Sequence, residues 1–155
     1  MQYVSWNYRG LDTSLKEEAI RDLVIVMRPE GLLIQETKLE EDALLRASNS
    51  FWKKGPGRAV SARGASRGLA TFWDFAKLEL VEEEGTIHWL FTKLIHKESG
   101  HLVSLFNMYV PVSFVEKKEC WDSLKLFLNQ HNLENLVVTE DLNVTLALAK
   151  KKGDQ

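Results

Sequence analysis

Two apolar runs in the sequence each lead into side chains that carry carboxylates or amides. Glu36 closely follows a Leu-Leu-Ile run, and Asp141 and Asn143 closely follow a Leu-Val-Val run. Continuous apolar runs of this kind are typical of strands that are covered on both faces. Ligands of open α/β sheets bind beyond the carboxyl ends of such strands. If the two strands lie side by side, the three polar residues meet and offer the oxygen ligands that Mg²⁺ prefers.

Each of these residues also has an ordinary structural explanation. A single acidic residue at the end of a strand more often lies in a solvated loop or caps a helix than binds a metal. For Glu36 the alternative is specific, because Thr37 and Glu40 can begin a short helix whose first turn favours an anion. The pattern occurs twice, which favours the functional interpretation modestly, and the sequence alone leaves both open.

Capping and periodicity indicate the elements that position these residues. A first strand ends at Asn7, a helix with a capping box at Ser14 ends before Pro29, and the strand that precedes Glu36 follows. This β-α-β unit predicts a right-handed crossover and two parallel strands. Asn7 and Glu36 should then lie at the same edge of a sheet.

The middle of the chain has the pattern of an antiparallel meander, because short polar links separate its strands. The four expected strands span residues 68–73, 78–82, 86–95 and 101–110. Pro111 ends the last strand, so Tyr109 can project from its end. A helix capped by Ser113 and Glu116 should follow through Gln130. Its apolar side is expected to contain Cys120, Trp121, Leu124, Phe127 and Leu128.

Composition is that of an ordinary globular protein. The 155 residues suit one domain, and 45% hydrophobic and 27% charged residues argue against a disordered or membrane-spanning chain. Cys120 is the only cysteine, which excludes an internal disulfide and favours a reducing compartment. The first residues lack the basic start and apolar core of a secretion signal. We therefore expect an intracellular monomer, in the nucleus or cytoplasm, with no membrane contact and no disulfide-linked partner.

Charge is distributed unevenly although the formal net charge is only −2. No acidic residue lies between Asp42 and Asp74. The six basic residues in this interval are Arg46, Lys53, Lys54, Arg58, Arg63 and Arg67. A local basic stretch can contact the phosphates of a polyanion, whereas a solvated loop is an equally open alternative.

Four short motifs occur in the order that one known family shows. They are Ser5-Trp6-Asn7, Gln35-Glu36-Thr37-Lys38, Asn107-Met108-Tyr109-Val110-Pro111 and Asp141-Leu142-Asn143. On these motifs the chain resembles the endonuclease/exonuclease/phosphatase superfamily. Three further stretches look most like plant non-LTR (LINE-type) retrotransposon endonucleases, which are relatives of the apurinic-site endonucleases. These stretches are residues 6–11, 68–74 and 117–121.

The resemblance covers residues 1–155 and implies an α/β four-layer sandwich (DNase I-like), incomplete at the carboxyl end. It implies a divalent-metal-dependent DNA endonuclease that uses Mg²⁺ or Mn²⁺. By the match of the motifs, Glu36 corresponds to the carboxylate that holds the metal, and Asn7 corresponds to an amide beside it. Tyr109 corresponds to a hydroxyl near the scissile phosphate. Asp141 matches the group that orients the nucleophile or assists the leaving group, and Asn143 matches its supporting amide. The residues expected to contact DNA phosphates are Arg58, Arg63 and Arg67.

Two departures from the family pattern bear on activity. Glu140 stands where the family has glycine, and a neighbouring carboxylate can raise the pKa of Asp141 or displace the metal. The closing aspartate-histidine pair of the family has no match after Asn143, and none of the four histidines is predicted to replace it. We therefore expect a carboxyl-terminally truncated domain that cleaves poorly. The alternatives are a non-catalytic remnant or nucleic-acid-binding fragment, and a phosphoesterase for small phosphorylated substrates, since this fold hosts both kinds of chemistry.

Overall fold

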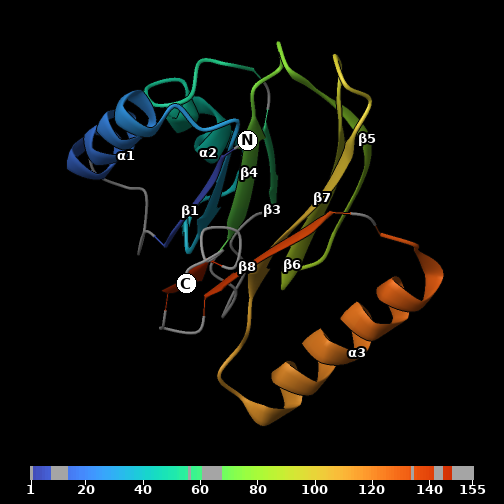
Figure 1. Cartoon of the computed structure of the whole chain (residues 1–155). Helices are drawn as coiled ribbons and strands as arrows, with labels where there is room; N and C mark the ends of the chain where they lie inside the picture. Colours follow the sequence, from blue (N-terminus) through green and yellow to red (C-terminus); the bar gives the residue numbers. More distant parts are fainter. Residues whose placement is uncertain are drawn as a thin grey trace.

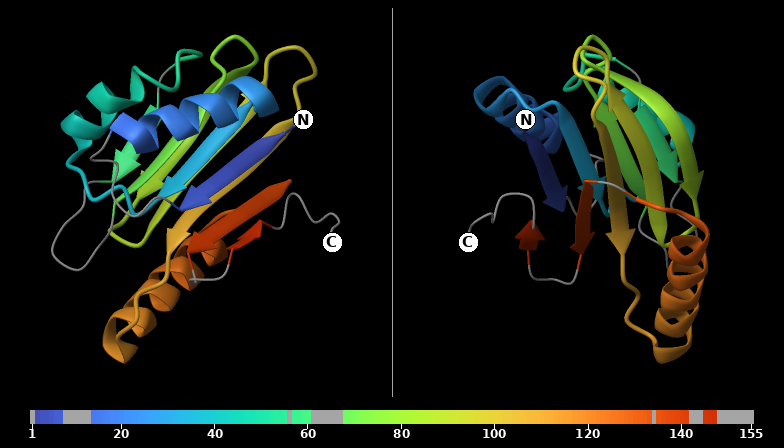
Figure 2. Two further views of the ribbon diagram at one scale, coloured as in Figure 1. Left: turned by 90° about the vertical axis from the view of Figure 1, so that its left-hand side faces the viewer. Right: turned by 45° about the vertical axis from the view of Figure 1, so that its right-hand side comes forward.

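Two β-sheets face each other in the computed structural model, with helices on both outer faces (Figures 1 and 2). The structure describes residues 2–7, 14–55, 57–60, 68–133, 135–141 and 145–147. Helices α1 and α2 cover the outer face of the first sheet, and α3 packs on the outer face of the second. This arrangement confirms the predicted four-layer α/β sandwich. No helix within these ranges is long and apolar enough to cross a membrane.

The first sheet has the strand order β1-β2-β4-β3. Its strands are β1 (Tyr3–Asn7), β2 (Gly31–Gln35), β4 (Leu69–Trp73) and β3 (Gly57–Val60). Strands β1 and β2 are parallel and joined by α1 (Ser14–Met27), so the predicted β-α-β unit is confirmed. Asn7 lies opposite Gln35 in the register of this pair, which brings the ends of both strands to one edge.

Helix α2 (Glu41–Ser48) begins later than its predicted cap implied. Glu40 is its N-cap residue and makes no side-chain capping bond. The Thr37 hydroxyl instead accepts a hydrogen bond from Leu39 N at 3.4 Å, so a local turn separates β2 from α2. The acidic residues in the first turn are Glu41 and Asp42. The interpretation of Glu36 as a first-turn anion of this helix is therefore wrong.

The second sheet has the strand order β5-β6-β7-β8-β9. Its strands are β5 (Leu78–Gly85), β6 (Trp89–His96), β7 (Leu102–Tyr109), β8 (Leu136–Asp141) and β9 (Thr145–Ala147). Strands β5, β6 and β7 form the predicted antiparallel meander, and β8 joins β7 in parallel. The short strand β9 was not predicted.

Strand β4 does not belong to the meander, which corrects the sequence prediction. It pairs antiparallel with β2 on one side and with β3 on the other. All five of its residues are buried, and a strand covered on both faces in this way belongs in the middle of a sheet between two layers. Turn chemistry alone could not distinguish a sheet change from a hairpin here.

Strands β2 and β8 do not lie side by side in one sheet, which was the condition considered for bringing Glu36 and Asp141 together. Strand β8 pairs with β7 and therefore belongs to the opposite sheet. The Gln35 amide of β2 donates to the Thr139 hydroxyl of β8 at 3.4 Å across the gap between the sheets. The two strands thus meet face to face.

Helix α3 (Phe114–Gln130) begins at the predicted cap, where the Ser113 hydroxyl accepts a hydrogen bond from Glu116 N at 3.1 Å. Cys120 and Phe127 are buried against the aromatic outer face of β6 and β7. Two residues that were expected on the buried side are substantially exposed, at 37% for Trp121 and 40% for Leu128. The helix therefore contacts the sheet along a narrower stripe than its apolar pattern indicated.

The layer between the two sheets changes character along the strands. Towards the start of β2 it is apolar and contains Leu33, Trp73, Leu78, Leu94, Val103 and Leu105. Towards the end of β2 it contains amide and hydroxyl groups that are buried and hydrogen-bonded to one another. This polar half lies directly behind the edge to which the sequence assigned the chemistry.

Candidate active site

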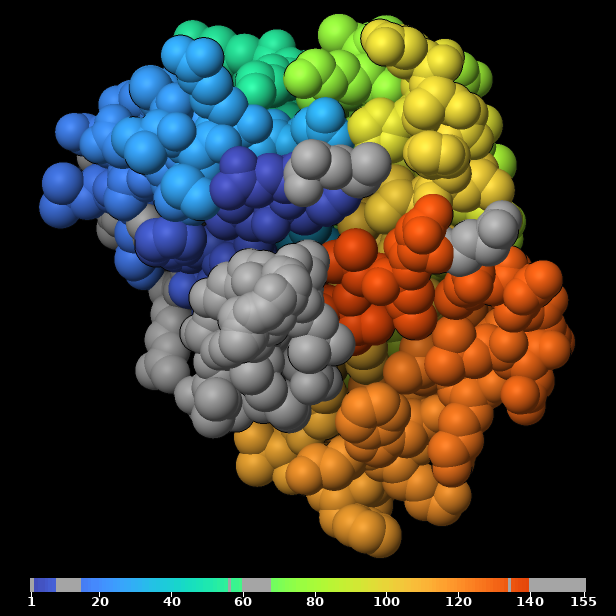
Figure 3. All heavy atoms as spheres, viewed as in Figure 1, coloured from blue at the N-terminus to red at the C-terminus, as the bar shows by residue number. Residues whose placement is uncertain are grey.

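The carboxyl ends of four strands from two sheets lie at one edge of the sandwich. Asn7 is in register with Gln35 in the first sheet, and Tyr109 is in register with Asp141 in the second. Gln35 Nε2 donates to Asn107 Oδ1 at 2.8 Å and thereby joins the two sheets one or two residues behind these ends. On the face seen in Figure 3, the blue atoms of β1 lie beside the orange-red atoms of β8.

Glu36 ends strand β2 in an unusual backbone conformation. Its φ is +58°, in the left-handed region that L residues other than glycine avoid at a cost of about 1–2 kcal/mol. The side chain is only 3% exposed, and the next residue is tied down because Thr37 N donates to Gly68 O at 3.3 Å. Backbone strain of this kind persists where the surroundings hold it, and such positions cluster at binding and catalytic sites.

Asn7 supplies an acceptor suited to a cation. Its Oδ1 is buried, and no group within the described ranges donates a hydrogen bond to it. Buried amide oxygens normally have a donor, so the lone pairs of this atom are available to a ligand such as a cation. A carboxylate and an amide oxygen match Mg²⁺ or Mn²⁺, which need only one or two protein carboxylates when water completes the shell.

The described part of the chain contains no cluster of three or more His, Cys, Asp or Glu residues that could hold a metal. Of the two carboxylates that the motifs assign to this edge, Glu36 and Asp141, only Glu36 has a described side chain. The backbone of Asp141 is described, but its side chain and that of Glu140 are not. Asn143 lies outside the described residues altogether.

Tyr109 lies at the end of β7, packed between the sheets against Leu69 and Leu90 and 7% exposed. Tyr109 N donates to His88 O at 2.8 Å, so His88 stands opposite Tyr109 just before β6 begins. His88 falls within residues 86–95, which the sequence predicted to be one strand of the meander. Strand register brings it instead to the same end of the sheet as the candidate site.

The His88 side chain is buried, and burial lowers the pKa of its imidazole. The carboxylates of Glu116 and Glu119 on α3 oppose that shift without cancelling it. Nε2 of this ring has no hydrogen-bond partner within the described ranges. The neutral imidazole is therefore the favoured form beside the end of β7.

Of the three predicted DNA-binding arginines, only Arg58 lies within the described residues. Arg58 projects from β3, donates from Nε to the carboxylate of Glu83, and lies over the Trp73 ring with its guanidinium carbon 5.9 Å from the ring centroid. Trp73 is in register with Gly31, the first residue of β2, so the Arg58 guanidinium lies towards the opposite end. Arg63 and Arg67 lie outside the described residues.

A hydrogen-bonded network that was not predicted from the sequence lies behind the candidate residues. Gln35 Nε2 donates to Asn107 Oδ1 at 2.8 Å, to Ser5 Oγ at 3.2 Å and to Thr139 Oγ1 at 3.4 Å. These contacts join β1, β2, β7 and β8 through one side chain. The available signal was a glutamine at the end of an otherwise apolar, fully buried strand.

Asn107 is the second centre of this network. Its Nδ2 donates to Ala70 O at 2.8 Å, to Ile34 O at 3.1 Å and to Thr71 Oγ1 at 3.3 Å. The side chain is fully buried and so ties β7 to β2 and β4 of the other sheet. An amide two residues before Tyr109 was the corresponding signal in the sequence.

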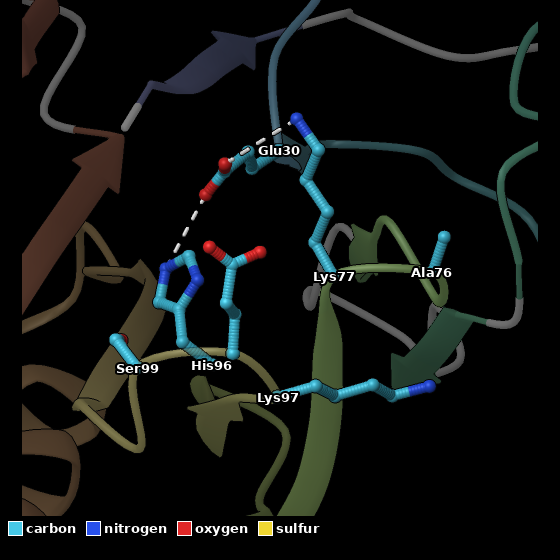
Figure 4. Close-up of a pocket in the computed structure, with 7 residues that line it drawn as sticks. Glu30, Ala76, Lys77, His96, Lys97 and Ser99 are labelled. Atoms are coloured by element: carbon cyan, nitrogen blue, oxygen red, sulfur yellow. Dashed lines mark ion pairs between the residues drawn. The ribbon is translucent and has the colours of Figure 1, made fainter.

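A pocket of about 600 Å³ lies at the other end of β2 (Figure 4). Glu30 Oε1 lies 3.4 Å from His96 Nε2, and Glu30 Oε2 lies 3.8 Å from Lys77 Nζ. Burial and the Glu30 carboxylate together raise the pKa of the Tyr3 phenol. The charges here pair with one another, so this pocket differs from the edge where β2 ends.

Comparison with known proteins identifies the fold. No protein-family model matches the chain, and no curated protein matches it in sequence. Its structure is similar to humanized TDP2 of D. rerio, with a TM-score of 0.68 at 18% identity over 99% of this chain and 67% of that one. It is also similar to the human Nocturnin catalytic domain, with a TM-score of 0.69 at 16% identity over 98% and 68%.

A third similar structure is the AP endonuclease LMAP of Leishmania major, with a TM-score of 0.60 at 20% identity over 92% of this chain and 55% of that one. The chain thus spans between about half and two thirds of the length of these three proteins. A further match, at a TM-score of 0.67 and 15% identity, is an endonuclease/exonuclease/phosphatase family protein of Bacteroides thetaiotaomicron. The chain therefore has the DNase I-like four-layer fold of endonuclease/exonuclease/phosphatase proteins.

Proposed function

We propose that the chain is a divalent-metal-dependent phosphodiesterase for DNA, and more narrowly an endonuclease of the retrotransposon and apurinic-site type. The observation that carries the proposal is the meeting of four strand ends at one edge, with Glu36 and the buried Asn7 oxygen on one sheet and Tyr109 and Asp141 on the other. An edge that combines a carboxylate, amides and a phenol suits phosphodiester hydrolysis.

Each group has a distinct task in this proposal. Mg²⁺ bound at Glu36 would neutralise charge on the phosphate oxygens and act as a Lewis acid. The Asn7 oxygen helps to hold the ion, and the Tyr109 hydroxyl donates a hydrogen bond to a non-bridging phosphate oxygen. Asp141 orients the attacking water and takes its proton as the new P–O bond forms. The bond from phosphorus to the leaving oxygen breaks, and that oxygen departs with the electron pair and takes a proton from solvent water. Asn143 fixes the Asp141 carboxylate by hydrogen bonding.

The ligands and activities of similar structures favour a phosphate-containing substrate. One D. rerio TDP2 structure is a complex with a single-strand DNA product, and the human Nocturnin structure contains a sulfate anion. A mannosyl-6-phosphatase has the same fold at a TM-score of 0.67 and 15% identity. A small phosphate ester is therefore the rival substrate class that an experiment must exclude.

Slow turnover is part of the proposal. The resemblance implies a closing aspartate-histidine pair, and none of the four histidines among the 155 residues is assigned to it. A positioned general acid or base typically contributes about 10²–10⁴-fold to a rate. Glu140 beside Asp141 is expected to slow the reaction further by raising the pKa of the Asp141 carboxyl.

The test is nicking of supercoiled plasmid in the presence of Mg²⁺. We expect slow nicking that Glu36→Gln or chelation of the metal abolishes and that the control Glu30→Gln retains. A chimera with Glu140→Gly and the carboxyl-terminal portion of an AP endonuclease should nick about 10²–10⁴-fold faster. Hydrolysis of mannose 6-phosphate without nicking would identify a phosphatase, and equal nicking by the wild type and Glu36→Gln would refute the assigned site.

A further inference from the structure

We propose that Gln35 and Asn107 are positioning residues, which set the strand ends that carry the candidate catalytic groups. The inference deepens the proposed function and rests on it, because it concerns the same edge. Neither side chain is expected to touch metal or substrate. Their role is to act through the residues that follow them in the chain.

The first argument is the spacing along the four strands. Every strand that ends at the site carries one network residue shortly before its candidate residue. The pairs are Ser5 and Asn7, Gln35 and Glu36, Asn107 and Tyr109, and Thr139 and Asp141. Residues two apart in a strand lie on the same face, so three network members lie directly behind a candidate group. Gln35 is the last residue of β2 before the left-handed turn at Glu36.

The second argument is that the contacts join the sheets rather than fill space. Gln35 Nε2 bonds to residues of β1, β7 and β8, and Asn107 Nδ2 bonds to carbonyls of β2 and β4. Apolar packing tolerates small sliding movements, whereas hydrogen bonds between buried amides require one register. Such bonds are stronger in the low-dielectric interior than in water.

Two other buried polar residues of the second sheet, Thr92 and Ser104, do not form such links within the described part of the chain. Thr92 on β6 is fully buried, yet its hydroxyl has no hydrogen-bond partner within the described ranges. Ser104 on β7 is in the same situation. Burial of a polar side chain in the second sheet is therefore not enough to form a link between the sheets. Thr92 provides a control for a buried polar group that lies outside the network.

The experiment compares Gln35→Met and Thr139→Val with the matched control Thr92→Val. Two readouts are the Mn²⁺ affinity, followed by electron paramagnetic resonance, and the ¹⁹F spectrum of protein labelled with 3-fluorotyrosine. Tyr109→Phe assigns the Tyr109 signal among the three tyrosines. Denaturant unfolding shows that each variant is folded.

We expect Gln35→Met to weaken Mn²⁺ binding about 10–100-fold, as substitution behind metal ligands typically does. The Tyr109 signal should shift or broaden in Gln35→Met and Thr139→Val. Thr92→Val should match the wild type in both readouts. Unchanged affinity and signal in Gln35→Met, or equal changes in Thr92→Val, would overturn the inference.

Failure of the proposed function has a different signature. If Glu36→Gln retains the Mn²⁺ affinity of the wild type, or if the wild type binds no Mn²⁺, the metal site is wrong. The Tyr109 signal then decides the positioning role by itself. If Glu36→Gln loses Mn²⁺ while Gln35→Met behaves as wild type in both readouts, only the positioning role is wrong.

Discussion

The two ends of strand β2 carry the same chemical group in different surroundings. Glu30 immediately precedes the strand and Glu36 immediately follows it. Glu30 lies in a pocket beside the cationic or titratable side chains of Lys77 and His96. Glu36 follows Gln35, whose side chain lies between the sheets and is hydrogen-bonded to neutral amide and hydroxyl groups. Charge pairing organises one end, and neutral hydrogen bonds organise the other.

The difference indicates what each end can do. Partly exposed ion pairs contribute little and tolerate side-chain movement, so the Glu30 end closes the sandwich without demanding precise geometry. Buried neutral networks fix a backbone without adding charge that would compete for a metal ion. A carboxylate at the end of such a strand is therefore attached to a backbone that is held in one position.

The largest expected effect is a loss of folding stability that leaves metal binding at the candidate site unchanged. Leu33 is fully buried in the apolar half of the layer between the sheets. Leu33→Ala should lower the free energy of unfolding by about 2–5 kcal/mol, because it leaves a cavity. Urea denaturation measures this loss. The Mn²⁺ affinity of the folded variant should be that of the wild type, and a parallel loss of affinity would show that the two halves of the layer are not independent.

A smaller effect concerns backbone strain at the two ends of the sandwich, near Glu36 at one end and near Glu30 at the other. Lys38 is exposed with φ of +57°, so Lys38→Gly should raise the free energy of unfolding by about 1 kcal/mol. At the other end Gly100 has φ of +77° with open space around it, and Gly100→Ala should lower the free energy of unfolding by about 1 kcal/mol. Thermal and urea denaturation measure the change in the free energy of unfolding for both variants. Loss of stability in Lys38→Gly would mean that the lysine side chain makes contacts that outweigh its strain.

The ion pairs of Glu30 should matter less. Glu30→Gln removes its attraction to Lys77 and His96 and should change the free energy of unfolding by less than about 1 kcal/mol at pH 7. Denaturation in low and in high salt checks the origin of the effect, since salt screens such pairs. A loss well above this value would show that the Glu30 end is as strictly organised as the Glu36 end.

The subtlest effect is a dependence of stability on pH through His88. Burial lowers the pKa of its imidazole in the folded chain, so the unfolded chain binds a proton more readily. The free energy of unfolding should therefore fall as the pH drops below about 6.5, the ordinary value for histidine. His88→Gln should weaken this fall, whereas His101→Gln at an exposed position serves as control. Identical pH profiles for the wild type and His88→Gln would contradict the burial argument.

Local signals predicted the local elements well. The capping box at Ser113 and Glu116 marks the start of α3, and the β-α-β unit from Asn7 to Glu36 has the expected parallel strands. These features depend on neighbouring residues only. The burial of Trp121 was predicted wrongly, because helical periodicity gives the direction of an apolar face but not the width of its contact.

Long-range pairing was beyond the sequence patterns. The partners of β4 and the face-to-face meeting of β2 and β8 depend on which sheet each strand joins, and turn residues do not encode that choice. The network of Gln35 and Asn107 was missed for the same reason, because its members come from strands far apart in the chain. The sequence marks the ends of the strands more clearly than the contacts that align them.

Binding of Mn²⁺ to three proteins tests the central claim most directly. The wild type, Glu36→Gln and Glu30→Gln are titrated with Mn²⁺ and followed by electron paramagnetic resonance, so that the same substitution is compared at the two ends of β2. We expect Glu36→Gln to lose Mn²⁺ binding and Glu30→Gln to bind Mn²⁺ with the affinity of the wild type. Undiminished binding in Glu36→Gln, or an equal loss in Glu30→Gln, would contradict a metal site at the carboxyl end of β2.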